Sequence, residues 1–349
     1  MSRVRTRTER SYEQSQQIYN RTTAIAGHSL TRSKAPGHLF GIGDGPLYVR
    51  TASGCHLVDV DGNEYIDMVC ALGAISLGYR HQVVTHAAET AIWDGWLYSL
   101  PSALEAVAAE AVMAKVAPWA SSVRFVKTGS EATHAAYRIA RHATGRPYVL
   151  VADNAYHGWH DWTWFDGAAR TSESGTAHRY HYGVDWARVG FECCRPDQIA
   201  AIFIEPARWE DPDSDGWLRR TREFCDKIGG LLVFDEMIYG GRWALGGATE
   251  YFGVTPDLAC FGKAIGNGAP IACVVGTKAL AAHGELIAGT YSGDTAARAA
   301  LGATLEVYSG SGVVEALWVV NAPGDIVWQA ERVLGENISG PIQGFSRGD

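Results

Sequence analysis

Short apolar runs separated by stretches of helical periodicity mark the middle of the chain. The runs cover residues Val123–Val126, Tyr148–Val151, Ile199–Ile204, Leu231–Phe234, Leu258–Phe261 and Ile271–Val275. Continuous apolar runs of this length are typical of strands covered on both faces, as in a mostly parallel sheet. The pattern therefore predicts an alternating α/β fold around such a sheet.

Two motifs predict where helices begin. Thr128 and Glu131 stand three residues apart, as in a capping box, and Ser102 and Glu105 repeat that spacing. Apolar residues then recur with helical spacing after both motifs, at Ala136, Ile139 and Ala140 and at Leu104, Val107, Ala108, Ala111 and Val112. We therefore predict one helix from Gly129 and another that ends before Pro118.

The stretch before residue 100 has a different pattern. Leu47–Val49, Leu57–Val60 and Glu64–Asp67 are short strand candidates separated by turn residues, and Asp61-Gly62-Asn63 is a hairpin signal. This stretch predicts a small antiparallel sheet.

Composition is consistent with a large protein that buries a substantial core. The chain has 349 residues, of which 47% are apolar and 19% charged, and this size favours one large and one smaller domain. A net charge of −8 argues against nucleic acid or an anionic membrane as the main partner. No segment approaches the run of roughly 18 apolar residues that a membrane span needs. Seven cysteines without CxxC spacing favour a reducing compartment, so we expect a cytoplasmic protein.

Lys263 follows a predicted strand and lies in a glycine-bounded turn, Gly262-Lys263-Ala264-Ile265-Gly266. A primary amine becomes a useful nucleophile toward a carbonyl when its pKa is lowered and its motion restricted, and such a turn can do both. Asp235 ends another strand, and in pyridoxal phosphate sites an aspartate pairs with the protonated pyridine nitrogen. Taken singly, either residue is more commonly a solvated surface group.

The turn at Gly129 and Ser130 is a candidate site for an anion. A strand, a glycine-containing turn and a helix start form an anion site, because the first backbone N–H groups of a helix lack internal partners. A cofactor phosphate would fit there, although an ordinary capped helix has the same sequence pattern. His157, His160 and Asp161 have no further residues that close a ligand set, so we expect no metal.

Eight motifs occur in an order found in one family: Thr128–Thr133, Tyr156–Gly158, Glu205–Pro206, Asp235–Glu236, Gly246–Ala248, Gly253–Asp257, Lys263 and Gly289–Gly293. In this the chain resembles class III pyridoxal phosphate-dependent aminotransferases, and most of all the glutamate-1-semialdehyde 2,1-aminomutase-like branch. The resemblance runs from about residue 36 to residue 307. It implies fold type I, with a mostly parallel seven-stranded sheet in a large domain and a smaller α+β domain.

The resemblance also implies roles for two catalytic residues. Lys263 would form the internal aldimine with pyridoxal 5'-phosphate and later shuttle a proton, and Asp235 would pair with the pyridine nitrogen. It further implies a set of cofactor-binding residues. Those that hold the phosphate or the ring are Gly129, Ser130, Tyr156, His157, Glu205 and Met237. Thr290 would reach the phosphate of the other subunit of a homodimer.

The implied domains are an N-terminal arm with the first part of the small domain in residues 1–85, a large cofactor-binding domain in residues 86–310, and a shortened C-terminal segment in residues 311–349. That last segment is shorter than the family's, where it helps to close the active site.

Several residues bear on the substrate. Ser29 and Arg32 stand where the aminomutase-like branch places a serine and an arginine that receive the substrate carboxylate, a contact that suits a guanidinium. Leu72 stands near the position of that branch's active-site tryptophan, which argues against the semialdehyde substrate. Arg242 matches a family arginine of structural role. Three tryptophans after Tyr156 are either pocket-lining or core residues: Trp159, Trp162 and Trp164.

Three functions stay open at this stage. The first is an aminotransferase that moves an amino group from a donor such as glutamate to a ketone or aldehyde. The second is an aminomutase that moves the group within one molecule. The third is a binding or scaffold homologue that has lost catalysis.

Overall fold

The computed structural model describes residues 10–29, 31–37, 45–153, 155–163, 175–187, 194–206, 216–310 and 312–314. The chain forms two compact units. The first holds Met1–Cys70 with Gly78–His81, and the second holds Ala71–Leu77 with Gln82–Asp349. The domain boundaries predicted from the sequence, at residues 85 and 310, remain predictions.

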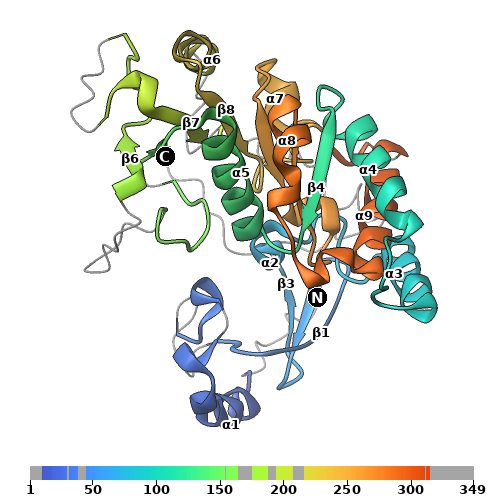
Figure 1. Ribbon diagram of the computed structural model, residues 1–349. Helices are drawn as coiled ribbons and strands as arrows, with labels where there is room; N and C mark the ends of the chain where they lie inside the picture. The colour runs from blue at the N-terminus through green and yellow to red at the C-terminus, as the bar shows by residue number, and fades with distance from the viewer. Residues whose placement is uncertain are drawn as a thin grey trace, which may run out of the picture. The chain divides into compact units, whose positions relative to one another are not determined.

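The first unit contains a three-stranded antiparallel sheet, β1 (Val49–Ser53), β2 (His56–Asp59) and β3 (Glu64–Ile66), drawn in light blue in Figure 1. The hairpin at Asp61–Asn63 joins β2 to β3 as predicted, and the buried Asp59 accepts a hydrogen bond from the backbone N–H of Asn63 (2.7 Å). The predicted strand Leu47–Val49 is wrong in its bounds, because pairing with β2 runs from Val49 to Ser53. The unit also holds the helices α1 (Glu13–Arg21), η1 (Thr22–Ala24), η2 (Ala26–His28) and η3 (Arg32–Lys34).

The second unit is built on a seven-stranded sheet. Its strand order is β4 (Ser122–Val126), β10 (Ala272–Gly276), β9 (Leu258–Phe261), β8 (Leu231–Asp235), β7 (Ile199–Ile204), β5 (Tyr148–Ala152) and β6 (Ala177–Tyr180). The strands from β9 to β6 run parallel, and β10 is antiparallel to β9 and β4. The predicted mostly parallel sheet is therefore confirmed. β6 was missed, because His178 and Arg179 interrupt its apolar pattern.

Helices cover both faces of this sheet. They are α3 (Gln82–Asp94), α4 (Ala103–Lys115), α5 (Gly129–Thr144), α6 (Trp217–Ile228), α7 (Gly247–Phe252), α8 (Lys278–His283) and α9 (Thr295–Gly310). One turn, α2 (Cys70–Gly73), and four short 3-10 segments complete the described elements: η5 (Pro196–Gln198), η6 (Lys263–Gly266), η7 (Gly284–Leu286) and η8 (Thr290–Gly293).

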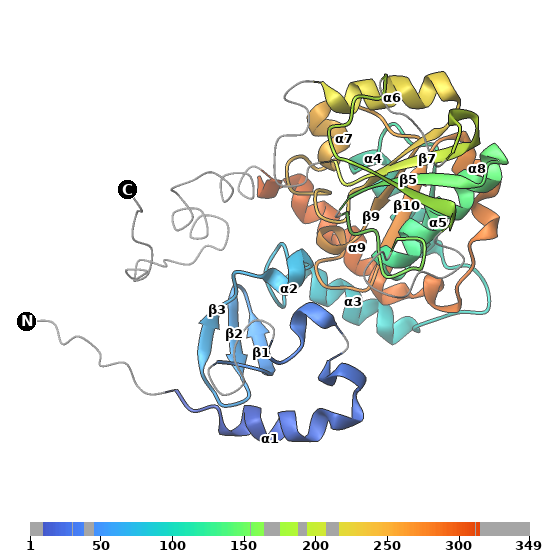
Figure 2. The same ribbon diagram turned by 90° about the vertical axis from the view of Figure 1, so that its left-hand side faces the viewer.

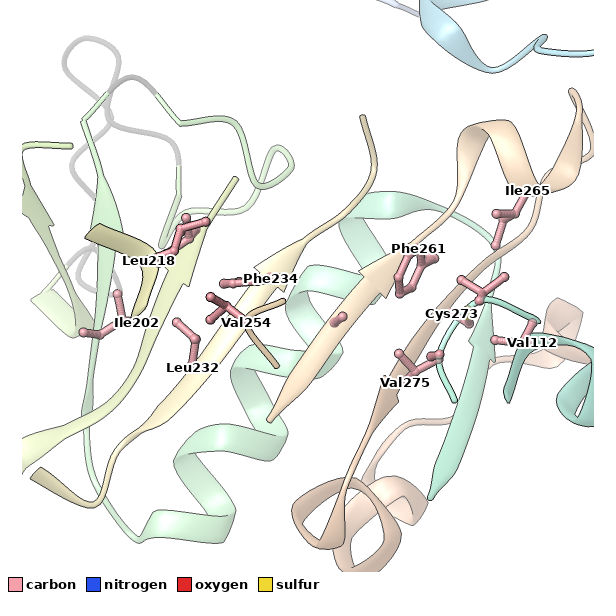
Figure 3. Packing of buried hydrophobic residues seen from close by; sticks show 14 of the residues in the cluster. Val112, Ile202, Leu218, Leu232, Phe234, Val254, Phe261, Ile265, Cys273 and Val275 are labelled. Carbon is pink, nitrogen blue, oxygen red and sulfur yellow. The ribbon is translucent and has the colours of Figure 1, made fainter. Parts of the chain in front are cut away.

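Successive side chains along each strand point to opposite faces of the sheet, and this produces an apolar core on each face. Ile202 and Ile204 of β7 pack in one core with α4, α6 and α9, and Phe203 between them packs in the other with α5. Figure 2 shows α5 and α8 together on one side of β5, β7, β9 and β10. Figure 3 shows residues of the first core from several strands and helices, among them Val112, Leu232, Phe234, Phe261 and Val275. Burial on both faces is the main stabilising term, at about 25 cal/mol per Å² of apolar surface.

The two predicted capping boxes turned out differently. At α5 both bonds form: the Thr128 hydroxyl accepts from the Glu131 N–H, and the Glu131 carboxylate accepts from the Thr128 N–H. At α4 the Ser102 hydroxyl accepts from the N–H of Leu104 instead of Glu105. The prediction there was wrong, since the Glu105 carboxylate lies 3.8 Å from the buried Arg298. No helix in the described part of the chain is long and apolar enough to cross a membrane.

Candidate active site

Three polar side chains follow the carboxyl ends of neighbouring parallel strands. Glu205 comes directly after β7, Asp235 is the last residue of β8, and Lys263 lies two positions after β9. Because β7, β8 and β9 are adjacent and parallel, these ends meet at one edge of the sheet. Open α/β sheets bind ligands at this edge.

Asp235 is held by a buried histidine. Its Oδ2 lies 2.9 Å from Nδ1 of His157, and the two side chains are 3% and 1% exposed. Asp235 Oδ1 accepts a hydrogen bond from the N–H of Met237 (3.1 Å). The Thr133 hydroxyl of α5 donates to the backbone carbonyl of His157 (2.5 Å) and so fixes the histidine. The carboxylate is thereby oriented by contacts on both of its oxygens.

Lys263 begins the segment η6 in an unusual backbone conformation. Its φ is +48°, in the left-handed region that a residue with a side chain seldom occupies. Burial lowers the pKa of the Lys263 amine, Asp235 and Glu205 raise it, and the guanidinium of Arg242 lowers it further. An amine whose pKa is lowered in this way is a better nucleophile than a fully solvated lysine.

The start of α5 offers free backbone donors. The capping box satisfies the N–H of Glu131, whereas the N–H groups of Gly129 and Ser130 have no acceptor among the described residues. These groups, together with the positive end of the helix dipole, suit an anion. Gly158 packs directly on this turn, since a Cβ at Gly158 would lie 2.7 Å from Oγ of Ser130.

Met237 lies between two glycines. A Cβ added at Gly129 would be 2.9 Å from the Met237 sulfur, and one added at Gly262 would be 2.7 Å from it. Both positions therefore require the absence of a side chain for Met237 to pack where it does. The thioether links the turn at Gly129 and Ser130 to the segment that carries Lys263.

Tyr156 and Glu205 are joined through the backbone. The N–H of Tyr156 donates to Oε2 of Glu205 (3.0 Å), and Tyr156 as a whole is 55% exposed. Burial of its hydroxyl and the charge of Asp235 raise the pKa of Tyr156. The ring is thus available to a planar ligand beside Asp235.

Thr290 begins η8 and is exposed. Two contacts hold the loop around η8: Arg298 donates to the carbonyl of Ser292, and Lys127 forms a 2.6 Å ion pair with Asp294. Lys127 directly precedes the capping residue of α5, so the two segments are tied together. The substrate candidates Ser29 and Arg32 belong to the first unit, and their predicted role stays a prediction.

Sequence reasoning missed several contacts of this region. It gave no partner to the His157 ring and assigned no role to Glu236 or Asn267. The one usable signal was the Asn-Gly pair after Lys263, since asparagine tolerates the left-handed φ of +42° found at Asn267. Trp162 is fully buried and stacks on Tyr137 with ring centroids 4.5 Å apart, so it is a core residue. Trp164 lies outside the described residues. No group of three potential metal ligands occurs in the described ranges.

Known proteins similar to this chain belong to one family. The family model for class-III aminotransferases matches residues 42–180 and 190–320. The glutamate-1-semialdehyde 2,1-aminomutase of Syntrophobacter fumaroxidans is 38% identical over 79% of this chain and 68% of its own length. That of Desulforamulus reducens is 33% identical over 88% of this chain and 75% of its own length.

Solved structures give the same result. The PLP internal aldimine form of the FumI protein from Sphingopyxis sp. MTA144 superposes with a TM-score of 0.77 at 29% identity, over 88% of this chain and 75% of that one. A transaminase with PLP bound superposes with a TM-score of 0.75 at 26% identity, over 84% and 73%. The predicted fold type I architecture is therefore confirmed, and the chain belongs to the class III aminotransferases.

Proposed function

We propose that this protein transfers an amino group from a small amino donor to a ketone or aldehyde, using pyridoxal 5'-phosphate. The observation that carries the proposal is the half-buried Lys263 amine, whose pKa burial lowers, together with the charge of Asp235 acting on it, a carboxylate held by His157. Solved relatives described as transaminases support the intermolecular reaction.

The residues of the site fit the cofactor. The free N–H groups of Gly129 and Ser130 would bind its phosphate, and the glycines on either side of Met237 leave room that side chains would fill. Asp235 would hold the proton of the pyridine nitrogen, and His157 would keep that carboxylate in place. Tyr156 would lie along the ring, and Glu205 would stand near its hydroxyl. When bound, the cofactor supplies an aldehyde carbon that can carry an amino group and a ring that withdraws electrons from the substrate carbon.

Lys263 would act on the proton of the substrate carbon. Its amine has a lowered pKa, so the neutral form that accepts a proton is more populated than in a solvated lysine. The left-handed backbone at Lys263 fixes the start of its side chain, which limits the positions that the amine can reach.

Assembly is the second part of the proposal. We expect a homodimer in which Thr290 reaches the phosphate held by the partner's site. Exposed apolar side chains near the end of α3 and in η8 support such a contact surface, among them Trp93 (89% exposed), Leu100 (78%) and Tyr291 (66%). Burying rings of this size against a second copy would be strongly favourable.

An intramolecular aminomutase reaction is the second candidate. It is favoured by the relatives named glutamate-1-semialdehyde 2,1-aminomutase, which are 33 to 38% identical. Leu72, which stands near the position of that branch's active-site tryptophan, argues against it.

Borohydride reduction of the cofactor-loaded protein tests the cofactor site. We expect the visible absorption to disappear and the cofactor to become attached to Lys263, as read by peptide mass spectrometry. Attachment to another lysine would refute the assignment. Mixing the protein with candidate donors then separates the reactions: a released keto acid indicates intermolecular transfer, and conversion of the semialdehyde without one indicates the aminomutase.

A further inference from the structure

The turn that carries Lys263 is fastened to a distant segment of the same unit. Asn267, which ends η6, accepts hydrogen bonds at Oδ1 from the N–H groups of Ser76 (3.0 Å) and Leu77 (2.9 Å). The Ser76 hydroxyl donates to the carbonyl of Ala264 (3.1 Å). Ile75 packs on the same turn, since a Cβ at Gly268 would lie 2.6 Å from its Cδ1.

That segment is itself in a strained conformation. Ala71 and Leu72 have φ of +52° and +62°, and Gly73 has +77°. Left-handed backbone is unfavourable for residues with a side chain, so surrounding contacts must hold the segment in place.

Arg242 provides such a contact. Its guanidinium donates from Nη2 to the carbonyl of Gly73, and a Cβ at Gly73 would lie 2.5 Å from that nitrogen. The Nε of Arg242 is buried and has no partner among the described residues. Arg242 follows the tight turn at Gly240, where a Cβ would lie 2.6 Å from the Phe261 ring of β9. The turn after β8 thus brings the arginine beside the Lys263 segment.

We propose that Arg242 is a positioning residue for Lys263. By fixing Gly73 it holds the segment Ala71–Leu77 against the turn Lys263–Asn267, and its positive charge acts on the Lys263 amine. The inference rests on the proposed function, because it concerns the lysine that would bear the cofactor.

The charges around the amine give the direction of the effect. The charged groups that face Lys263 are Asp235, Glu205 and Arg242, and only the arginine disfavours the protonated amine by its charge. Removing the guanidinium charge should therefore raise the pKa of Lys263 and leave less neutral amine at a given pH.

Two matched variants separate charge from contact. Arg242→Gln keeps a hydrogen-bond donor without the charge, and Arg242→Lys keeps the charge without the planar guanidinium. In the full chain without added cofactor, Lys263 is labelled with a trace of acetic anhydride across a pH series, and the exposed Lys278 serves as the reference. We expect several-fold slower relative labelling of Lys263 near neutral pH in Arg242→Gln and a much smaller change in Arg242→Lys. Equal labelling of wild type and a folded Arg242→Gln at every pH would overturn the charge effect and with it the proposal.

Hydrogen exchange in the same preparations measures how firmly Arg242 and Asn267 hold the turn that carries Lys263. The peptide that contains residues 263–267 should exchange faster in Arg242→Gln, in Arg242→Lys and in Asn267→Ala, which removes the acceptor for Ser76 and Leu77. Asn267→Asp keeps an acceptor there and should exchange like wild type. Unchanged exchange in those of Arg242→Gln, Arg242→Lys and Asn267→Ala that fold would also overturn the proposal. None of these readouts needs the cofactor, so borohydride attachment at Lys263 remains an independent test of the proposed function.

Discussion

Nδ1 of His157 lies 2.9 Å from Oδ2 of Asp235, and both side chains are almost completely buried. The contact joins the loop before Gly158 to the end of β8, residues that are 78 positions apart. A buried carboxylate without such a partner is costly, so the histidine orients Asp235 and also compensates for its burial.

Replacing His157 should therefore weaken both the fold and the site. We expect His157→Phe to lower the free energy of unfolding by about 3 kcal/mol, because it leaves a buried carboxylate without its partner. His157→Asn places an amide N–H near the position of Nδ1 and should lose less than half as much. Urea unfolding of the two variants measures the difference, and equal losses would mean that ring volume matters more than the hydrogen bond.

Asp235→Asn tests whether Asp235 keeps the pyridine nitrogen of the cofactor protonated. The amide keeps an oxygen that can accept from the N–H of Met237, so the fold and much of the cofactor affinity should persist. An amide cannot hold the pyridine nitrogen protonated, and the rate of amino transfer should fall by a factor of about 100 or more. Steady-state kinetics beside a cofactor titration checks this, and near-normal turnover would assign the role to another residue.

Gly158→Ala should displace the turn at Gly129 and Ser130, the proposed phosphate site. The new Cβ would lie 2.7 Å from the Ser130 Oγ, and φ at Gly158 is +102°. Gly183→Ala is the matched control, because φ there is +79° but no atom lies within 4 Å of the added Cβ. Each variant should lose about 1 kcal/mol from backbone strain. Only Gly158→Ala should also bind pyridoxal phosphate more weakly, as measured by absorbance titration; a similar loss in both would deny a role to Ser130 packing.

Glu236 should make stability depend on pH. Burial raises the pKa of its carboxyl to about 7 in the folded protein, against hydrogen bonds from Ala248 and Thr249 that lower it. A raised carboxyl pKa means that the folded state binds the proton more tightly than the unfolded state. This contribution is complete below the unfolded pKa and is lost as pH rises through about 7.

The loss should amount to at most roughly 3 kcal/mol, at 1.36 kcal/mol per pKa unit. Urea unfolding at pH 5 and pH 8 should therefore give a smaller pH difference for Glu236→Gln than for wild type. Glu250→Gln is the control, since Glu250 is exposed and accepts from the N–H of Gly246. If Glu236→Gln retains the full pH difference, the titrating group lies elsewhere.

The proposed role of Thr290 links cofactor binding to dimer formation. If each site uses Thr290 of the partner chain, the cofactor binds only the dimer and stabilises it by about 2.7 kcal/mol at a hundredfold excess over its Kd. Sedimentation of the dilute protein should show more dimer with the cofactor than without it. Thr290→Val should reduce this gain, whereas the exposed Thr255→Val should not. A monomer fully loaded with cofactor would contradict the shared site.

The sequence by itself determined six of the seven strands of the second unit's sheet and the start of α5. β7 and β9 have the predicted bounds, and β5 and β8 each extend by one residue, because buried strands need unbroken apolar runs. The capping box at Thr128 was predictable because both of its partners lie within one turn of helix. Local chemistry also placed Asp235 and Lys263 at the ends of strands.

Only the tertiary structure decided which distant groups meet. Ser102 caps α4 through Leu104, while Glu105 faces Arg298 of another helix. Asn267 bonds to Leu77 across 190 positions, and His157 bonds to Asp235 across 78. Such contacts depend on strand order and on the close approach that glycines such as Gly73 and Gly158 permit. Periodicity along the chain carries no information about either, because it reports which face of an element is buried and not what that face contacts.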